Sequence, residues 1–236
     1  MSPLRSFVVA GAVTLIFSVS AQAADMPGYP SLPPPASIKP LRVDEFLSGW
    51  YLRGDLGYRF QRFNGAASDF PPDPTDNKLN NTVFGGFGGG FKEKWFRADL
   101  TADYGWRSNY SGTVGTTGDQ AKIDSYTVLG NIYFDLGTWG GLTPYIGAGA
   151  GGAYLTMSNF TTSPATGAAI ASRSRWNFAW AAMAGVSYRL SENWLIDVGY
   201  RHIDMGDAVG GPEANSLTLK KLTGDEIRVG LRYKID

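Results

Sequence analysis

The sequence predicts an all-β fold, namely an eight-stranded antiparallel transmembrane β-barrel with short periplasmic turns and four long outer loops. Three observations predict it. Apolar and polar side chains alternate in a series of segments of about ten residues, the length that crosses a bilayer as a tilted strand. The connections between these segments alternate between long and short. The chain also begins with a sequence typical of exported proteins.

Residues 1–23 have the features of a cleaved signal peptide. Arg5 gives a short positive region, residues 7–19 are largely apolar, and Ala21 and Ala23 supply the small side chains that signal peptidase reads. The alternative is a membrane anchor, but this apolar run is shorter than the ~20 residues that a spanning helix needs. We therefore expect an exported mature protein.

Residues 24–48 are predicted to form a proline-rich periplasmic linker. The segment contains Pro27, Pro30, Pro33, Pro34, Pro35 and Pro40. Such a run favours an extended polyproline conformation and cannot join a sheet ladder. A binding role for this segment is the alternative. The predicted barrel then occupies residues 49–236.

Six segments show clear alternation between an apolar face and a polar face. In the first of them, Trp50, Leu52 and Leu56 oppose Arg53 and Asp55. The six segments cover residues 50–60, 96–107, 126–135, 175–189, 194–201 and 226–235. Two glycine-rich segments complete the count of eight, although their faces cannot be assigned from the sequence; they cover residues 82–91 and 144–155.

The connections separate a membrane barrel from a soluble β-sandwich. The long connections are 61–81, 108–122, 156–174 and 203–224, and the short ones are 92–95, 136–143 and 190–193. Membrane barrels have short periplasmic turns and longer outer loops. Tryptophans near segment ends predict an interfacial aromatic girdle; they are Trp50, Trp95, Trp106, Trp176 and Trp194. A sandwich also alternates, but charged residues in the middle of the polar faces favour a barrel.

Four motifs carry a resemblance to a known family. They are Gly-Trp-Tyr-Leu-Arg-Gly-Asp-Leu-Gly-Tyr at 49–58, Leu-Thr-Pro-Tyr-Ile-Gly-Ala-Gly at 142–149, Asp-Val-Gly-Tyr-Arg-His-Ile-Asp at 197–204 and Ile-Arg-Val-Gly-Leu-Arg-Tyr at 227–233. With them the chain resembles the outer-membrane β-barrel family of alphaproteobacteria, small porin-like or immunogenic surface proteins related to the OmpA membrane domain and to opacity-type barrels. The chain departs from such barrels at its end, because Tyr233 is followed by Lys234, Ile235 and Asp236 rather than ending the chain as a terminal aromatic.

This resemblance implies where the protein acts and what surrounds it. It implies a Gram-negative outer membrane, with outer-membrane lipid and lipopolysaccharide as the surroundings. It also implies contact with the barrel-assembly machinery during biogenesis, and a host or surface ligand for the outer loops.

Eight strands leave a lumen just wide enough for side chains to fill. Buried charges are tolerated when they are paired, and arginine matches a carboxylate with a two-pronged fork. We therefore predict an ion-pair network that plugs and rigidifies the barrel. A narrow charged pore is the alternative. The residues predicted to face the lumen are Arg53, Asp55, Arg59, Arg97, Asp99, Asp103, Arg107, Asp135, Arg189, Asp197, Arg201, Glu226, Arg228 and Arg232.

Nothing in the sequence predicts catalysis, a cofactor or a metal. The chain has no cysteine and a single histidine, His202, which shares its face with Trp194 and Tyr200 and should lie outside near the upper rim. An interfacial role for His202 is favoured over catalysis. The glycine run at 85–90 lacks the Lys-Ser/Thr of a phosphate loop, and is expected to make room for a large neighbour such as an inward arginine. Basic and acidic residues number 21 each, so nucleic acid is not an expected partner.

The sequence therefore predicts a non-enzymatic surface barrel that contributes to envelope integrity. Its loops 61–81 and 203–224 are the expected contact surfaces. A small porin-like diffusion channel is the alternative function, and an enzyme acting on outer-leaflet lipid is a more distant one.

Overall fold

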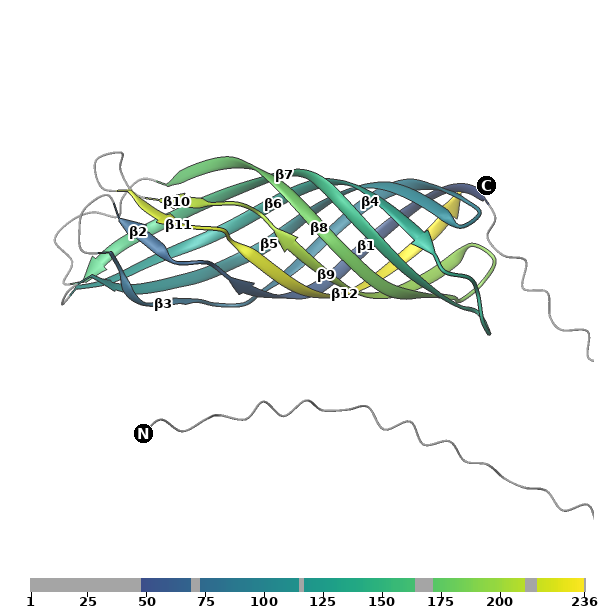
Figure 1. Ribbon diagram of the computed structural model, residues 1–236, viewed down its shortest axis with the longest axis horizontal. Helices are drawn as coiled ribbons and strands as arrows, with labels where there is room; N and C mark the ends of the chain where they lie inside the picture. The colour runs from purple at the N-terminus through teal and green to yellow at the C-terminus, as the bar shows by residue number, and fades with distance from the viewer. Residues whose placement is uncertain (1–47, 69–72, 115–116, 164–171, 211–215, 236) are drawn as a thin grey trace, which may run out of the picture. The chain divides into compact units, whose positions relative to one another are not determined.

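The computed structural model describes residues 48–68, 73–114, 117–163, 172–210 and 216–235. Eight long strands within these ranges form the barrel (Figure 1). They are β1 (Ser48–Arg62), β4 (Thr82–Glu93), β5 (Phe96–Val114), β6 (Thr117–Asp135), β7 (Leu142–Ser163), β8 (Arg173–Arg189), β9 (Trp194–Asp204) and β12 (Thr223–Ile235). The predicted signal peptide and all but the last residue of the predicted linker lie outside the described residues.

The eight strands form a closed antiparallel barrel. Each pairs with the strand that follows it in this series, and β1 closes the ring by pairing with β12. In this closing pair, Trp50 lies opposite Ile235 and Arg62 lies opposite Thr223. The predicted eight-stranded barrel is therefore confirmed. Within the described ranges no helix is long and apolar enough to span a membrane.

Two of the predicted long loops are largely strand. The segment 108–122 was expected to be a loop, but β5 continues to Val114 and β6 begins at Thr117. A bulge between Gly105 and Ser108 moves the inward positions of β5 from odd to even numbers, so Tyr110 faces inward. The alternation of apolar and polar residues breaks at this bulge, so the sequence pattern predicts a strand end at residue 107 although β5 continues. In the same way β7 extends to Ser163.

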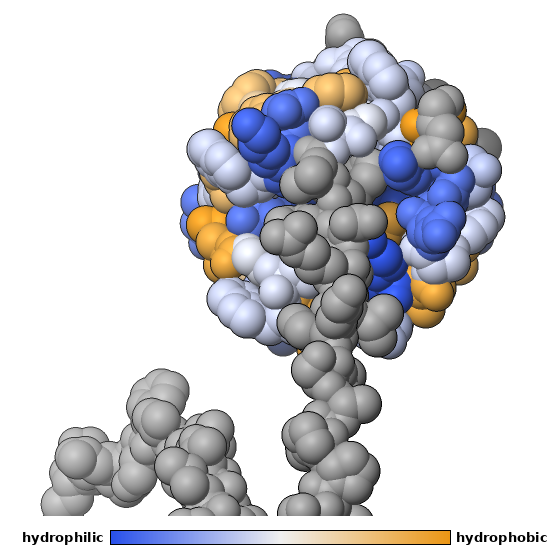
Figure 2. Space-filling view, turned by 90° about the vertical axis from the view of Figure 1, so that its right-hand side faces the viewer, coloured by the Kyte–Doolittle hydropathy of each residue, from blue (hydrophilic) through white to orange (hydrophobic). Residues whose placement is uncertain are grey.

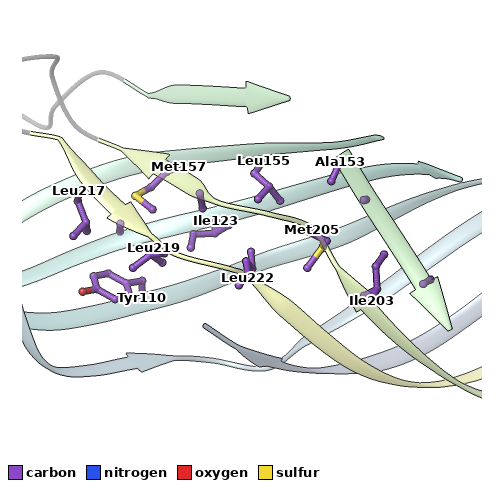
Figure 3. Packing of buried hydrophobic residues seen from close by; sticks show 14 of the residues in the cluster. Tyr110, Ile123, Ala153, Leu155, Met157, Ile203, Met205, Leu217, Leu219 and Leu222 are labelled. Carbon is purple, nitrogen blue, oxygen red and sulfur yellow. The ribbon is translucent and has the colours of Figure 1, made fainter. Parts of the chain in front are cut away.

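The other two outer connections fold back onto the mouth of the barrel. Short strands β2 (Ala66–Ser68), β10 (Ala208–Gly210) and β11 (Leu217–Leu219) form a three-stranded antiparallel sheet, and β3 (Thr75–Leu79) pairs with β5. Their apolar side chains meet those of the long strands in a buried cluster (Figure 3). The cluster includes Tyr110, Ile123, Leu155, Met157, Met205, Leu217, Leu219 and Leu222.

The outer surface of the barrel is apolar where a bilayer would surround it. Large apolar side chains such as Trp50, Leu56 and Phe87 are more than half exposed, which is expected for a surface that faces lipid. Figure 2 shows the end of the barrel where β1 begins and β12 ends, with hydrophobic residues interspersed among hydrophilic ones around its edge. The short connections lie at this end, which is therefore the periplasmic one.

Candidate functional site: the charged lumen

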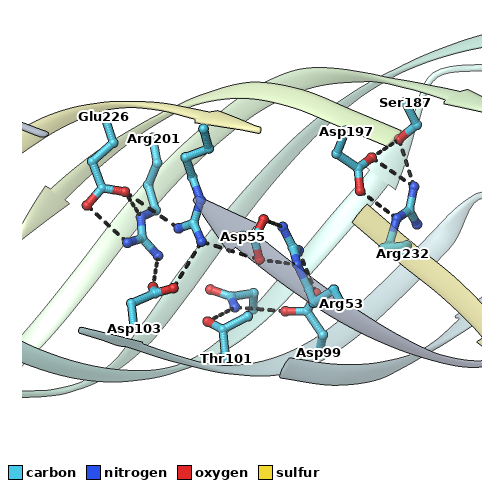
Figure 4. Close-up of polar contacts among 12 residues, drawn as sticks. Arg53, Asp55, Asp99, Thr101, Asp103, Ser187, Asp197, Arg201, Glu226 and Arg232 are labelled. Atoms are coloured by element: carbon cyan, nitrogen blue, oxygen red, sulfur yellow. Dashed lines mark hydrogen bonds and ion pairs between the residues drawn. The ribbon is translucent and has the colours of Figure 1, made fainter. Parts of the chain in front are cut away.

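A carboxylate from β12 organises the upper part of the charged lumen. Glu226 is fully buried and accepts a hydrogen bond from Arg201 Nε at 2.6 Å (Figure 4). It also accepts one from Arg59 Nε at 2.7 Å. Arg201 also donates from Nη1 to Asp103 at 2.7 Å. Arg228 donates to the other oxygen of Asp103 at 3.1 Å. Three arginines therefore share two carboxylates in a space that water scarcely reaches.

A second group of polar side chains lies around Arg53. Its guanidinium holds Asp55 in a two-pronged contact, with distances of 2.7 and 2.8 Å, and it donates to Asp99 at 2.9 Å. Asn131 donates to the other oxygen of Asp99 at 2.8 Å. Arg228 lies 3.5 Å from Asp55 and so connects this group to the first. Two-pronged arginine–carboxylate contacts fix geometry as well as charge, so this group holds strands β1, β5 and β6 in place.

The third group of charged side chains lies in the periplasmic part of the lumen. Arg232 donates to both oxygens of Asp197, at 2.6 and 2.9 Å, and to the Ser187 hydroxyl at 2.8 Å. Asp135 is held by Arg97 at 2.9 Å and by the ammonium of Lys92. The ion pairs in the three groups connect side chains from different strands, as Arg201 of β9 does with Asp103 of β5 and Lys92 of β4 does with Asp135 of β6.

Aromatic rings pack against the arginine guanidinium groups where no carboxylate contacts them. The Phe84 ring is fully buried and lies 5.0 to 5.6 Å from the guanidinium carbons of Arg59, Arg201 and Arg228. A ring face attracts a cation, and the attraction strengthens when water is excluded. Arg59 Nη2 and Arg228 Nε have no hydrogen-bond partner among the described residues, so the ring is their compensating neighbour.

The glycines of β4 make this arrangement possible. Their inward members, Gly86, Gly88 and Gly90, lie opposite Asp103, Thr101 and Asp99 of β5. A methyl group at Gly86 would overlap the Asp103 carboxylate, and one at Gly90 would overlap Asp99. The sequence predicted room for an inward arginine. In the structure this room is taken by two carboxylates and a threonine, which belong to the adjacent strand β5.

The structure places the predicted lumen residues as follows. All of them except Arg107 and Arg189 are buried and take part in the ion pairs above. The prediction for Arg107 is wrong, because the bulge in β5 turns it outward, where its side chain is 58% exposed and pairs with Asp124 at 3.4 Å. Arg189 is half-buried at the end of β8.

Sequence reasoning missed several contributors to the network, including Lys92, Asn131 and Ser187. Lys92 was assigned to a turn, yet it is buried and paired with Asp135. The outward positions of Val83, Phe87 and Phe91 would have placed Lys92 inward by alternation. Asn131 belongs to the predicted strand 126–135 but is absent from the residues predicted to face the lumen. No signal in the sequence distinguishes it from an ordinary inward polar residue.

A small cavity lies between the charged groups. A cavity of about 10 Å³ lies among Arg53, Tyr145, Asp197 and Arg228, which is room for one water molecule. Above the charged layer, the apolar cluster fills the outer mouth with side chains such as Leu219 and Leu222, both fully buried. The lumen thus has a charged lower part and an apolar upper part.

The single histidine lies on the outside, near the outer rim. His202 Nδ1 is 2.8 Å from Asp225, and its ring packs on Trp180 with centroids 5.7 Å apart. Asp225 also accepts a hydrogen bond from Tyr200 at 2.6 Å and pairs with Arg62 at 3.2 Å. Within the described ranges, no hydroxyl nucleophile contacts His202, and no group of three potential ligands could hold a metal ion.

Closed antiparallel strands, an apolar girdle and a charged interior define the class of outer-membrane β-barrels. The chain belongs to the outer membrane protein beta-barrel domain family, whose model matches residues 10–234. The predicted resemblance and the outer-membrane location are therefore confirmed.

Curated relatives support the same assignment. An uncharacterized protein of Brucella abortus is 34% identical, covering 84% of this chain and 82% of the relative. The 25 kDa outer-membrane immunogenic protein of Brucella abortus is 26% identical and covers 99% of this chain and 100% of the relative. The outer membrane protein PagN of Salmonella typhimurium is 29% identical over 75% of this chain and 80% of its own.

Solved structures share the fold. The outer membrane protein OprG of Pseudomonas aeruginosa matches with a TM-score of 0.51 at 16% identity, covering 80% of this chain and 97% of its own. The outer membrane protein AlkL, determined in lipid bilayers, matches with a TM-score of 0.50 at 13% identity, covering 89% and 96%.

Proposed function

We propose that this protein is a structural surface barrel with a closed lumen. It contributes to envelope integrity and meets its surroundings through its outer end, without catalysis and without a diffusion path. Its partners on this proposal are outer-membrane lipid and lipopolysaccharide, the assembly machinery during biogenesis, and a surface or host ligand on the outer loops.

The proposal is supported by the side chains that lie in the described lumen. Arginine–carboxylate pairs occupy its lower part, and the cavity among Arg53, Asp197 and Arg228 measures only about 10 Å³. Apolar side chains occupy its upper part. A solute would have to break buried ion pairs and then displace an apolar cluster, and each step costs several kcal/mol.

The outer loops contribute unequally to the surface. Much of 203–224 packs into the mouth, since Met205, Leu217 and Leu222 are buried there. The predicted contact surface on this loop is therefore smaller than its length implies. The described part of 61–81 is more accessible, because Thr75, Asp76 and Lys78 are exposed.

Liposome swelling tests the closed lumen. Refolded barrel in vesicles should admit small neutral sugars no faster than empty vesicles do, while a general porin in the same vesicles provides the positive control. Swelling that depends on the amount of folded barrel would contradict the proposal. Replacing residues 73–80 with a neutral linker, with surface display retained, should reduce adhesion or antibody binding if this loop is a contact surface.

A narrow ion channel is the second candidate. The continuous row of charged groups from Glu226 to Asp135 favours it, because such groups would select ions if they separated. Conductance distinguishes this channel from the closed barrel, because ions can pass where sugars cannot.

A further inference from the structure

A hollow of about 670 Å³ lies on the outer face of the barrel where β5, β6 and β7 extend beyond the apolar girdle. Its polar lining consists of Asn109 and Ser111 from β5, Gln120 and Lys122 from β6, and Asn159 from β7. The lining also includes Tyr110 and Ala121 of the buried apolar cluster, while the five polar side chains are exposed or half-buried. None of the features described above uses these five side chains.

Local backbone geometry creates the hollow. The pairing of β6 with β7 shifts register between Gln120 and Lys122, so the partner strand carries an extra residue there. Asn159 lies in this irregularity with a φ of 52°, a left-handed conformation that asparagine tolerates better than most residues. A bulge of this kind bends and twists the sheet, which gives an otherwise flat outer face its concavity.

The lining has the chemistry of a sugar-binding surface. Asn109, Ser111, Gln120 and Asn159 offer amide and hydroxyl groups that can both donate and accept hydrogen bonds, as sugar hydroxyls do. Among the described residues, none of these side chains has a hydrogen-bond partner. Lys122 adds a cation, and no carboxylate is among the lining residues. This combination suits an oligosaccharide that carries a carboxylate or phosphate.

The height of the hollow above the membrane points to the source of that sugar. Trp106 is exposed and is one of the tryptophans predicted to form the interfacial girdle, and Asn109 and Ser111 follow it by three and five residues. At ~3.3 Å per residue and a tilt of ~40°, the hollow lies about 8–13 Å above the girdle. Lipid acyl chains do not reach this level. In an outer membrane it is the level of the sugars nearest the lipid.

We propose that this hollow, the β5–β7 groove, binds an acidic oligosaccharide, namely the inner core of the surrounding lipopolysaccharide. The amides and Ser111 would hold sugar hydroxyls while Lys122 pairs with the acidic group. The site requires only that this end of the barrel faces outward. It is therefore independent of whether the lumen conducts.

The test measures binding to the refolded barrel by isothermal titration calorimetry. One probe is lipid-free core oligosaccharide containing 3-deoxy-octulosonic acid, and the other is a chondroitin sulfate tetrasaccharide, which represents an external acidic glycan. Lys122→Gln should weaken binding of the core oligosaccharide about tenfold or more, as expected for a lost charge-assisted hydrogen bond. The double variant Asn109→Ala/Gln120→Ala should weaken it to a similar degree.

Lys94→Gln is the matched control, because it removes an exposed lysine from a turn at the opposite end of the barrel. It should change the Kd less than twofold, and heat-modifiable gel mobility should show that every variant is folded. Binding of the tetrasaccharide alone, lost in the groove variants, would keep the site and assign it to an external glycan. Absence of binding to both probes, or binding that the groove variants do not weaken, would overturn the proposal.

Discussion

Removing one carboxylate from the centre of the lumen should destabilise the barrel strongly. Glu226 is fully buried and is the ion-pair partner of Arg59, while Arg201 and Arg228 also contact it and retain Asp103. Glu226→Ala leaves Arg59 without a carboxylate in a space from which water is excluded. Breaking a buried pair in this way typically costs about 3–5 kcal/mol. The free energy of unfolding should fall by that amount.

The assay is urea unfolding of the refolded barrel in lipid vesicles, followed by tryptophan fluorescence and by gel mobility. Arg107→Ala provides the control, because it removes the more exposed partner of the Arg107–Asp124 pair, and Asp124 keeps its hydrogen bond from Tyr104. Since the Arg107 guanidinium is more than half exposed, water screens this pair, and its loss should cost only about 0–1 kcal/mol. Glu226→Gln should fall between the two, since the amide can still accept a hydrogen bond. If Glu226→Ala costs no more than Arg107→Ala, the buried network does not stabilise the barrel and the reasoning fails.

Three further predictions concern the β4 glycines, the apolar mouth and the histidine. Gly86→Val should destabilise the barrel in the same unfolding assay, because the valine side chain would overlap Asp103. Gly54→Val should be tolerated, since nothing lies within 4 Å of a Cβ there. An equal loss of unfolding free energy in both variants would contradict this steric explanation. Leu219→Asp puts an unpaired charge into the apolar cluster and should speed trypsin cleavage at the adjacent lysines, so an unchanged rate would show that the mouth is not packed as described. His202→Gln should leave outer-membrane lipid composition unchanged, and an altered composition would indicate catalysis.

Alternation predicted the strands well because a strand buried on one face must repeat every two residues. Alternation failed where a bulge adds a residue to a strand and so reverses which positions face inward. The bulge before Ser108 reversed the faces of β5, so Arg107 was placed inside and 108–122 was taken for a loop. Glycines left β4 with few alternating side chains, so the strand was ended at residue 91 and Lys92 was assigned to the turn.

The packing of the outer mouth could not be predicted from the sequence. Leu217 and Leu219 meet Met157 and Tyr110 only after the chain has folded. No local pattern in residues 203–224 distinguishes an inward-folded loop from an exposed one. The ion pairs across the lumen could not be predicted either. Alternation identifies which charged residues face inward, but it does not show which of them pair with one another.

The central claim is that the lumen is closed, and single-channel recording in a planar lipid bilayer tests it most directly. Demonstrably folded wild-type barrel should give no unitary current, while Glu226→Ala or Leu219→Asp should increase leak because each disrupts one layer of the filling. Stable and reproducible unitary steps from the wild-type barrel would contradict the account. They would make the arginines and carboxylates of the lumen the determinants of ion selectivity.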